Sequence, residues 1–284
     1  MPGVSEPRPQ QPVAVFDSGV GGMTVLHELL VSLPTEDYLY LGDTARFPYG
    51  DRTQEQLRAF SVEIAEYLLA QGAKLLVVAC NAASSAALGT LERHLAARGC
   101  EVDVIGVVAA ATQLAVAGSR SGRIGLLATP ATVASGAYER AVRAADPHVH
   151  LESVPCADLA PIIQSGFPFD IEVVETVREY CAPLRAAQVD TVVLGCTHYP
   201  LVAPMLQRIL GRDVTLVTSG AGVARSVERA LAARGLENPQ SEEGSYRFRC
   251  TGEASSFKAL GTRFLQMPLG EVAQVELGAA RAAA

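Results

Sequence analysis

The chain has 284 residues, of which 49% are hydrophobic and 19% charged, and its formal net charge is -7. This length accommodates two domains that each bury a core, and the apolar share is that of a globular protein. An acidic chain lacks the basic face that nucleic acid or an anionic membrane surface attracts, so neither is expected as the main partner.

The N-terminus and the cysteines indicate the cell compartment. Residues 1–12, MPGVSEPRPQQP, are polar and proline-rich without the apolar core of a signal peptide, which predicts a disordered tail. The longest nearly apolar stretch, residues 105–118, is shorter than a membrane span and is broken by Thr112 and Gln113. Six cysteines without close pairing indicate reduced thiols, and no zinc-site spacing occurs. We therefore expect a cytoplasmic protein without a metal.

Short β-rich runs alternate with longer helical patterns along the chain. The runs predicted as strands are residues 13–16, 38–41, 75–79, 104–107, 124–128, 149–154, 191–194 and 215–217. Between them, apolar residues recur at helical spacing, for example over 54–69 and 172–187. A run within residues 246–252 and a helical pattern near 255–266 follow. Continuous apolar strands separated by helices predict an α/β fold with parallel sheets covered on both faces.

Sliding the sequence against itself reveals two similar units. An offset of 116 lays residues 74–80 on residues 190–196, and an offset of 111 lays VAVFDSG on IGLLATP. Residues 13–108 and 124–218 are therefore predicted as two related units, although an alternation of strands and helices also matches itself by chance. The final run and helical pattern fall outside both units and could return to pack on the first.

Polar and glycine-rich motifs follow the predicted strands. These motifs are DSGVGG (17–22), GDTARFPYG (42–50), CNAASS (80–85), ATPAT (128–132) and GCTHYP (195–200). Ligands of parallel α/β sheets bind at the carboxyl ends of the strands, and these loops offer backbone N–H groups and hydroxyls that suit a small carboxylate. The dinucleotide pattern GxGxxG is absent and Asp17 would repel a phosphate, so a nucleotide is not expected.

Cys80 and Cys196 occupy the same place in the two units, after a strand and before a helical pattern. A thiol there lies near the positive end of a helix dipole, which predicts a lowered pKa and a reactive thiolate. Each cysteine could instead be a small buried hydrophobe. If the units face each other across a cleft, the thiols reach opposite sides of one ligand. That arrangement suits removal of a proton from one face of a carbon and return of a proton to the other.

Four motifs occur together and in order, namely FDSGVGG, GDTARFPYG, ACNAAS and GCTHYPL. On these motifs and the C-terminal YRFRCTG pattern, most of the chain resembles the cofactor-independent glutamate racemases, and the ending of GCTHYP favours them over the related aspartate racemases. The resemblance implies interconversion of L- and D-glutamate for bacterial peptidoglycan, without pyridoxal phosphate or metal and commonly as a homodimer. It also implies two pseudo-symmetric, flavodoxin-like α/β domains, residues 1–108 plus 215–284 and residues 109–214, with the active site in the cleft between them.

The resemblance assigns roles to individual residues. Cys80 matches the thiol that removes the α-proton of D-glutamate, and Cys196 matches the thiol that removes it from L-glutamate. Asp17 matches a carboxylate that assists the first thiol, and His198 an imidazole that assists the second. Without the resemblance, Asp17 could cap a loop and His198 could be a packed turn residue. The positions that match substrate-binding residues are Asp17, Ser18, Tyr49, Gly50, Asn81, Ala82, Thr197 and His198.

Two positions depart from the family pattern. Ala82 stands where the family usually has Thr or Ser, so a hydroxyl is missing, and Gln164 stands where the family has glutamate. An amide cannot take up a proton as a carboxylate can. These changes bear on rate and substrate affinity rather than on the fold. Asp43 and Arg46 lie within GDTARFPYG, where an ion pair inside the loop would explain them as well as a role in the site.

Three alternatives to a glutamate racemase remain. Another acidic substrate such as aspartate would keep both thiols. A redox protein would use Cys80 and Cys196 as a dithiol, which requires the two sulfurs to reach disulfide distance. A binding protein descended from a racemase would account for Ala82 and Gln164 as marks of lost catalysis.

Overall fold

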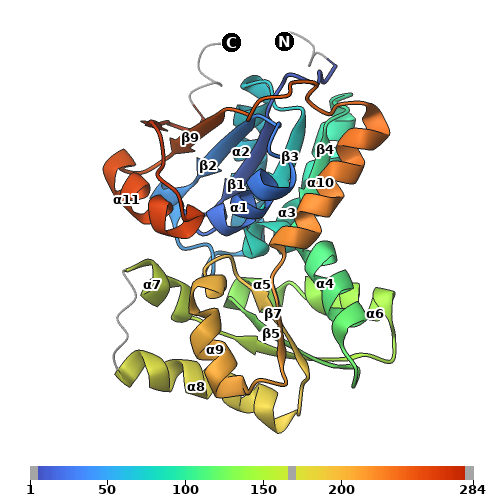
Figure 1. The fold of residues 1–284 in the computed structure, drawn as a ribbon, viewed down its shortest axis with the longest axis vertical. Helices are drawn as coiled ribbons and strands as arrows, with labels where there is room; N and C mark the ends of the chain where they lie inside the picture. Colours follow the sequence, from blue (N-terminus) through green and yellow to red (C-terminus); the bar gives the residue numbers. More distant parts are fainter. Residues whose placement is uncertain (1–5, 166–170, 279–284) are drawn as a thin grey trace.

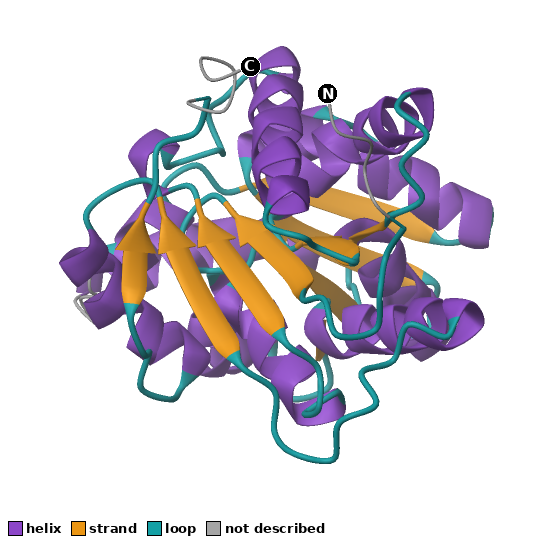
Figure 2. Cartoon of the chain, turned by 90° about the horizontal axis from the view of Figure 1, so that it is seen from above, coloured by secondary structure: helices purple, strands orange, loops and turns teal. Residues whose placement is uncertain are grey.

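The computed structural model describes residues 6–165 and 171–278. The chain forms two lobes, one above the other in Figure 1, each built around a parallel sheet. Helices lie on both sides of the strands, as Figure 2 shows. The predicted α/β class with parallel sheets is therefore confirmed.

The first lobe contains a six-stranded sheet in which every pairing is parallel. Its strands in spatial order are β10 (Val272–Gln274), β9 (Tyr246–Cys250), β2 (Tyr38–Gly42), β1 (Val13–Asp17), β3 (Leu75–Val78) and β4 (Asp103–Gly106). The C-terminal strand β9 pairs with β2, so the end of the chain returns to the first unit. The short edge strand β10 was not predicted from the sequence.

Helices cover both faces of this sheet because its central strands β1, β2 and β3 are buried and almost entirely apolar. Alternate residues Ala14 and Phe16 of β1 pack with the helices on one face, whereas Val13 and Val15 pack with those on the other. The first face carries α2 (Gln54–Ala70) and α3 (Asn81–Ala97), and the second carries α1 (Met23–Ser32), α10 (Gly220–Arg234) and α11 (Ala254–Leu265). Burial on both faces accounts for the unbroken apolar runs in the sequence.

The second lobe contains a four-stranded parallel sheet. Its strands in spatial order are β6 (His150–Pro155), β5 (Arg123–Ala128), β7 (Thr191–Gly195) and β8 (Thr215–Val217). The longer helices around it are α4 (Val107–Gly118), α6 (Ala137–Ala145), α8 (Ile171–Ala186) and α9 (Ala203–Leu210). Shorter turns are α5 (Pro130–Ala134), α7 (Leu159–Gln164) and the 3-10 helices η1 (Thr44–Arg46) and η2 (Tyr199–Val202).

The two sheets repeat one topology, which supports the internal repeat read from the sequence. Spatial order β2-β1-β3-β4 in the first lobe matches β6-β5-β7-β8 in the second, strand for strand. The strands β9 and β10 extend only the first sheet. Strand β8 pairs with β7, so residues 215–217 are part of the second sheet. The division into domains 1–108 plus 215–284 and 109–214 stays a prediction.

Residues 1–12 were expected to form a disordered tail, but residues 6–12 have a described structure. Residues 1–5 lie outside the described part. The cause is a buried ion pair in which Lys74 Nζ lies 2.6 Å from Glu36 Oε2. The same ammonium donates to the carbonyls of Pro9 at 2.5 Å and Leu236 at 2.7 Å. A buried ammonium needs several acceptors, and Pro9 supplies one, which fixes the N-terminal segment against the first lobe.

Among residues 6–165 and 171–278, no helix is both long and apolar enough to cross a lipid bilayer. The nearly apolar stretch 105–118 instead contains the last two residues of β4 and the whole of α4, in which Val107 and Ala111 are buried.

Candidate active site

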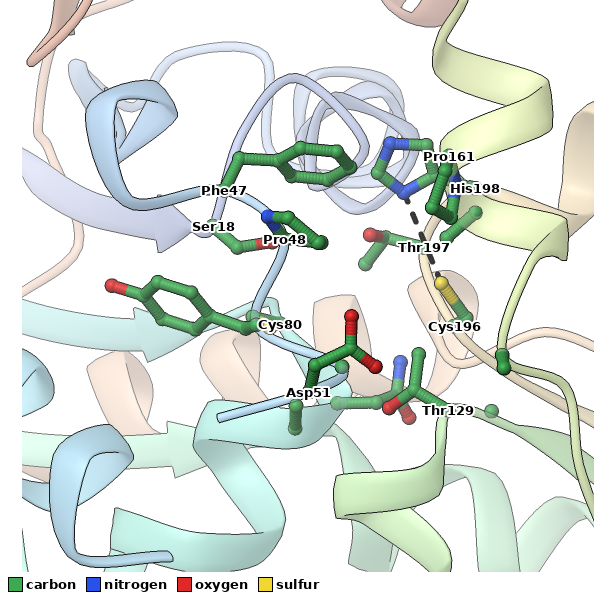
Figure 3. A pocket seen from close by; sticks show the side chains of 17 residues that line it. Ser18, Phe47, Pro48, Asp51, Cys80, Thr129, Pro161, Cys196, Thr197 and His198 are labelled. Atoms are coloured by element: carbon green, nitrogen blue, oxygen red, sulfur yellow. Dashed lines mark hydrogen bonds between the residues drawn. The ribbon is translucent and has the colours of Figure 1, made fainter. Parts of the chain in front are cut away.

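A small pocket lies between the two lobes, at the carboxyl ends of the strands. Its walls come from the loops that follow β1, β2 and β3 in the first lobe and β5 and β7 in the second. The predicted residues that line it are Ser18, Tyr49, Gly50, Cys80, Asn81, Ala82, Cys196, Thr197 and His198. Figure 3 shows Cys196 beside His198, with Ser18 and Cys80 farther across the pocket. The structure thus brings nearly every predicted site residue to one place.

Cys80 enters the pocket from the first lobe, at the N-cap of α3. The hydroxyl and the backbone N–H of Ser18 and the backbone N–H of Ala83 lie near its sulfur and act to lower its pKa. These donors and the N-terminus of a 17-residue helix favour the thiolate. The predicted position of this thiol, between a strand and a helix, is confirmed.

Cys196 enters from the second lobe, directly after β7. Cys196 is followed by a turn and the 3-10 helix η2 rather than directly by an α-helix. The prediction that a helix dipole acts on this thiol is therefore wrong. Its partner is instead the imidazole of His198, whose Nδ1 lies 3.8 Å from the sulfur. The two thiols therefore have different local activators.

His198 links Cys196 to Gln164. The Nε2 atom of His198 lies 2.8 Å from Gln164 Oε1. When that nitrogen carries the proton and donates it to Gln164, Nδ1 presents a lone pair to the thiol of Cys196. Burial lowers the pKa of His198 to about 3, so the ring is neutral at physiological pH. A neutral imidazole in this tautomer can accept the thiol proton.

Asp17 is fully buried at the end of β1. Its Oδ2 accepts a hydrogen bond of 2.9 Å from the backbone N–H of Gly19, and its Oδ1 accepts one of 3.2 Å from Thr197 Oγ1 in the other lobe. Burial raises the pKa of Asp17 to about 6, against the effect of these hydrogen bonds. The carboxylate lies near both thiols, since its charge raises the pKa of each.

The expected lowering of the two thiol pKa values is wrong. Burial raises the pKa of Cys80 to about 12, and burial raises that of Cys196 well above its ordinary value. The charges of Asp17 and of the opposite thiol add to the shift of Cys196. Desolvation outweighs the hydrogen-bond donors, and the described residues that line the pocket include no lysine or arginine to offset it. A bound cation would reverse this balance.

The loop GDTARFPYG forms one wall of the pocket. Asp43 is buried and accepts hydrogen bonds from Arg46 Nε at 2.6 Å, from Thr251 Oγ1 at 2.8 Å and from the hydroxyl of Tyr49. The ion pair considered for Asp43 and Arg46 is therefore present. Tyr49 lines the pocket, and its hydroxyl proton is committed to Asp43.

Gly21 lets the lobes approach closely beside the active site. A Cβ atom there would lie 2.4 Å from Thr197 Oγ1 and 2.5 Å from His198 Nδ1, both in the second lobe. The hydroxyl of Thr24 also donates to the carbonyl of Thr197 at 3.2 Å. Gly21 of DSGVGG thus serves contact between the lobes.

Part of the pocket wall was missed by the sequence analysis. The missed residues are Phe47, Pro48, Asp51, Thr129, Ala157, Ala160, Pro161 and Gly195. Thr129 could have been found, because the offset of 111 residues lays it on Ser18. The same offset lays Asp17 on Ala128, so the second lobe has no equivalent of this carboxylate. The apolar wall residues carry no comparable pattern in the sequence.

The fold and the paired thiols are those of a racemase, and comparison with known proteins agrees. The Asp/Glu/Hydantoin racemase family matches residues 23–227, and the chain belongs to that family.

Glutamate racemases are among the proteins that this chain is similar to. The chain is 42% identical over 272 residues to a glutamate racemase from Geobacter metallireducens, covering 95% of this chain and 98% of the relative. A crystal structure of a glutamate racemase from Bacillus anthracis is 34% identical, with a TM-score of 0.89, and the match covers 95% of this chain and 99% of that one. A glutamate racemase from Francisella tularensis, solved in complex with D-glutamate, is 30% identical with a TM-score of 0.87 over 95% and 99% of the two chains.

Proposed function

We propose that this protein interconverts L- and D-glutamate by a two-base proton transfer and supplies D-glutamate for peptidoglycan synthesis. One observation carries the proposal: Cys80 and Cys196 enter one interlobe pocket from equivalent ends of two repeated sheets. The high identity to glutamate racemases over nearly the whole chain supports the substrate.

In the L-to-D direction Cys196 removes the α-proton and the thiol of Cys80 returns a proton to the opposite face of the carbon. His198 Nδ1 takes the thiol proton of Cys196, while Gln164 holds the tautomer from the other side of the ring. The ammonium group of glutamate supplies the positive charge that the pocket lacks, so substrate binding favours the thiolate. The thiolate is then formed only when the substrate is present.

In the D-to-L direction the roles of the thiols exchange. Cys80 removes the α-proton, assisted by Asp17, and Cys196 returns one. Asp17 is ionised near neutral pH, because its pKa of about 6 lies below the pH of the medium. Its hydrogen bonds to Gly19 and Thr197 hold the carboxylate in place between the lobes. The side chains and backbone N–H groups of Ser18, Asn81 and Thr197 bind the substrate carboxylates.

Proton NMR of L-glutamate with purified protein in heavy water tests the proposal. The α-proton signal should disappear while D-glutamate appears, because each inversion brings in solvent deuterium. Binding without exchange would identify a ligand-binding protein. Faster racemisation of aspartate in a panel of amino acids would assign the other acidic substrate, and dependence on reversible oxidation of the thiols would indicate a redox protein.

We expect racemisation to survive dialysis against a chelator and the purified protein to show no visible absorbance of pyridoxal phosphate. Both proton carriers of the proposed reaction are side chains of this chain, so no added group is needed for the transfer. The check is an assay before and after dialysis, together with an absorbance spectrum. Activity that disappears with the chelator and returns with metal would contradict the expectation.

Gln164→Glu is expected to raise kcat for L-glutamate by about tenfold and kcat for D-glutamate less. A carboxylate that accepts from His198 Nε2 makes Nδ1 more basic toward Cys196, the thiol that acts on L-glutamate. The enantiomers are equally stable, so kcat/KM stays equal in the two directions. The ratio of KM for L-glutamate to KM for D-glutamate must therefore rise by the same factor as the ratio of the two kcat values. Ala82→Thr should chiefly lower KM in both directions by restoring a hydroxyl. Measurement of kcat and KM for both enantiomers checks both variants.

The matched control is Gln188→Glu, which makes the same charge change at an exposed amide paired with Arg123, outside the pocket lining. It should leave all four constants unchanged. If Gln164→Glu leaves both kcat values unchanged or lowers them, the role given to Gln164 is wrong.

A cytoplasmic location, expected from the reduced cysteines, and a homodimer, implied by the family resemblance, remain part of this proposal. The location is supported by six free cysteines among the described residues, including the two reactive thiols, which must stay reduced. Fractionation of cells and light scattering of the purified protein test the two statements.

A further inference from the structure

Tyr138 joins the two lobes at the edge of the active site. It lies in α6, and its ring packs in the core of the second lobe with Ala111, Leu126 and Val193. Its hydroxyl donates a hydrogen bond of 2.7 Å to Oδ1 of Asn81, the first residue of α3 in the first lobe. Both side chains are buried, with exposed fractions of 0% and 3%. The contact therefore lies in a dry environment, where a hydrogen bond holds its geometry strongly.

The other end of the Asn81 amide is free. Among residues 6–165 and 171–278, Nδ2 of Asn81 is buried and has no hydrogen-bond partner, although Asn81 lines the pocket. A buried N–H group without a partner is costly, and such groups in native proteins await a ligand or water. The two N–H bonds of this nitrogen are suited to an oxygen of a carboxylate that enters the pocket.

The hydrogen bond to Tyr138 decides which end of the amide meets that ligand. Burial raises the pKa of Tyr138, so its hydroxyl stays protonated and can donate. While the hydroxyl donates to Oδ1, the NH₂ group faces the pocket. With the amide reversed, Oδ1 would face the pocket and repel a carboxylate.

We propose that Tyr138 is a positioning residue, which orients the Asn81 amide so that its NH₂ group binds a carboxylate of the substrate. The inference deepens the proposed glutamate racemisation and rests on it. Tyr138 acts through Asn81 and does not itself touch the substrate. Because the two residues belong to different lobes, packing of the lobes completes this part of the binding site.

A double-mutant cycle tests the proposal. Tyr138→Phe keeps the ring and removes the donor, and it should raise KM for both enantiomers about tenfold while kcat changes little. In an Asn81→Ala background the same substitution should have no further effect, because the group that it positions is gone. Tyr38→Phe is the matched control, since this buried hydroxyl donates to the carbonyls of Leu29 and Leu33 outside the pocket lining. It should leave KM unchanged.

If Asn81→Ala is too slow to assay, the same cycle is run on binding of racemic glutamate by calorimetry, and melting temperatures show that each variant is folded. An unchanged KM in folded Tyr138→Phe, or an equal loss of affinity in both backgrounds, would overturn the positioning role. A wild-type protein that does not racemise glutamate would instead overturn the proposed function, so the two failures are distinguishable.

Discussion

Replacing either Cys80 or Cys196 with alanine is expected to abolish racemisation of glutamate. Each direction of the proposed reaction needs one thiol to remove the proton and the other to return one, so the loss of either stops both directions. General acid or base catalysis by one group contributes roughly 10²- to 10⁴-fold, and here no second group stands in for it. The measurement is the appearance of the opposite enantiomer, followed by circular dichroism.

Serine variants separate the two halves of the reaction. Cys80→Ser keeps the thiol of Cys196 and should exchange the α-proton of L-glutamate with solvent weakly, without inversion. Cys196→Ser should do the same with D-glutamate. Proton NMR in heavy water measures this exchange for each enantiomer.

Cys100→Ala is the control for loss of a thiol, because Cys100 is also buried in the first lobe but lies outside the pocket lining. This variant should racemise normally. Near wild-type racemisation by either Cys80→Ala or Cys196→Ala would show that the two-thiol mechanism is wrong.

Asp17→Asn is expected to stabilise the protein while slowing racemisation, by roughly 10²-fold or more. Burial raises the pKa of Asp17 from 3.8 to about 6, so the ionised carboxylate above pH 6 opposes folding. A shift of about two units corresponds to about 3 kcal/mol of lost stability at neutral pH. Asparagine keeps an acceptor for Gly19 and can donate to Thr197, without the buried charge.

The pH dependence of this effect has a definite sign. Between pH 4 and pH 6 the unfolded state releases its proton before the folded state does, so the stability of the wild-type protein falls as the pH rises through this range. The difference in free energy of unfolding between Asp17→Asn and wild type should therefore be largest above pH 6 and vanish toward pH 4. Denaturant unfolding at several pH values measures it.

Asp190→Asn is the opposite control. The carboxylate of Asp190 accepts hydrogen bonds from Ser119 Oγ at 2.7 Å and from the backbone N–H groups of Arg120 and Ser121 at 2.8 and 2.7 Å. These bonds outweigh partial burial and lower the pKa of Asp190, so its charge stabilises the fold. Its replacement should lower the free energy of unfolding. Destabilisation by Asp17→Asn at neutral pH would show that the buried charge is not the controlling factor.

The sequence by itself determined the fold class, the strand positions and the repeat, because these depend on local hydrophobic period and on short motifs. The eight predicted strands from Val13 to Val217 match β1 to β8 within about one residue. The helix predicted over residues 54–69 is α2, Gln54–Ala70. The offset of 116 residues also placed Cys80 and Cys196 at equivalent strand ends, which was enough to suggest one reaction with two proton carriers.

Only the tertiary structure decided the electrostatics and the partners of these groups. Whether a helix dipole or desolvation controls a thiol depends on how deeply the thiol is buried, and both thiols prove to be buried, with desolvation as the largest cause of their pKa shifts. The contact of Gln164 with His198 joins positions 34 residues apart, and that of Tyr138 with Asn81 joins positions 57 apart. Such contacts leave no periodic trace in the sequence, because they join elements that meet only in the folded chain.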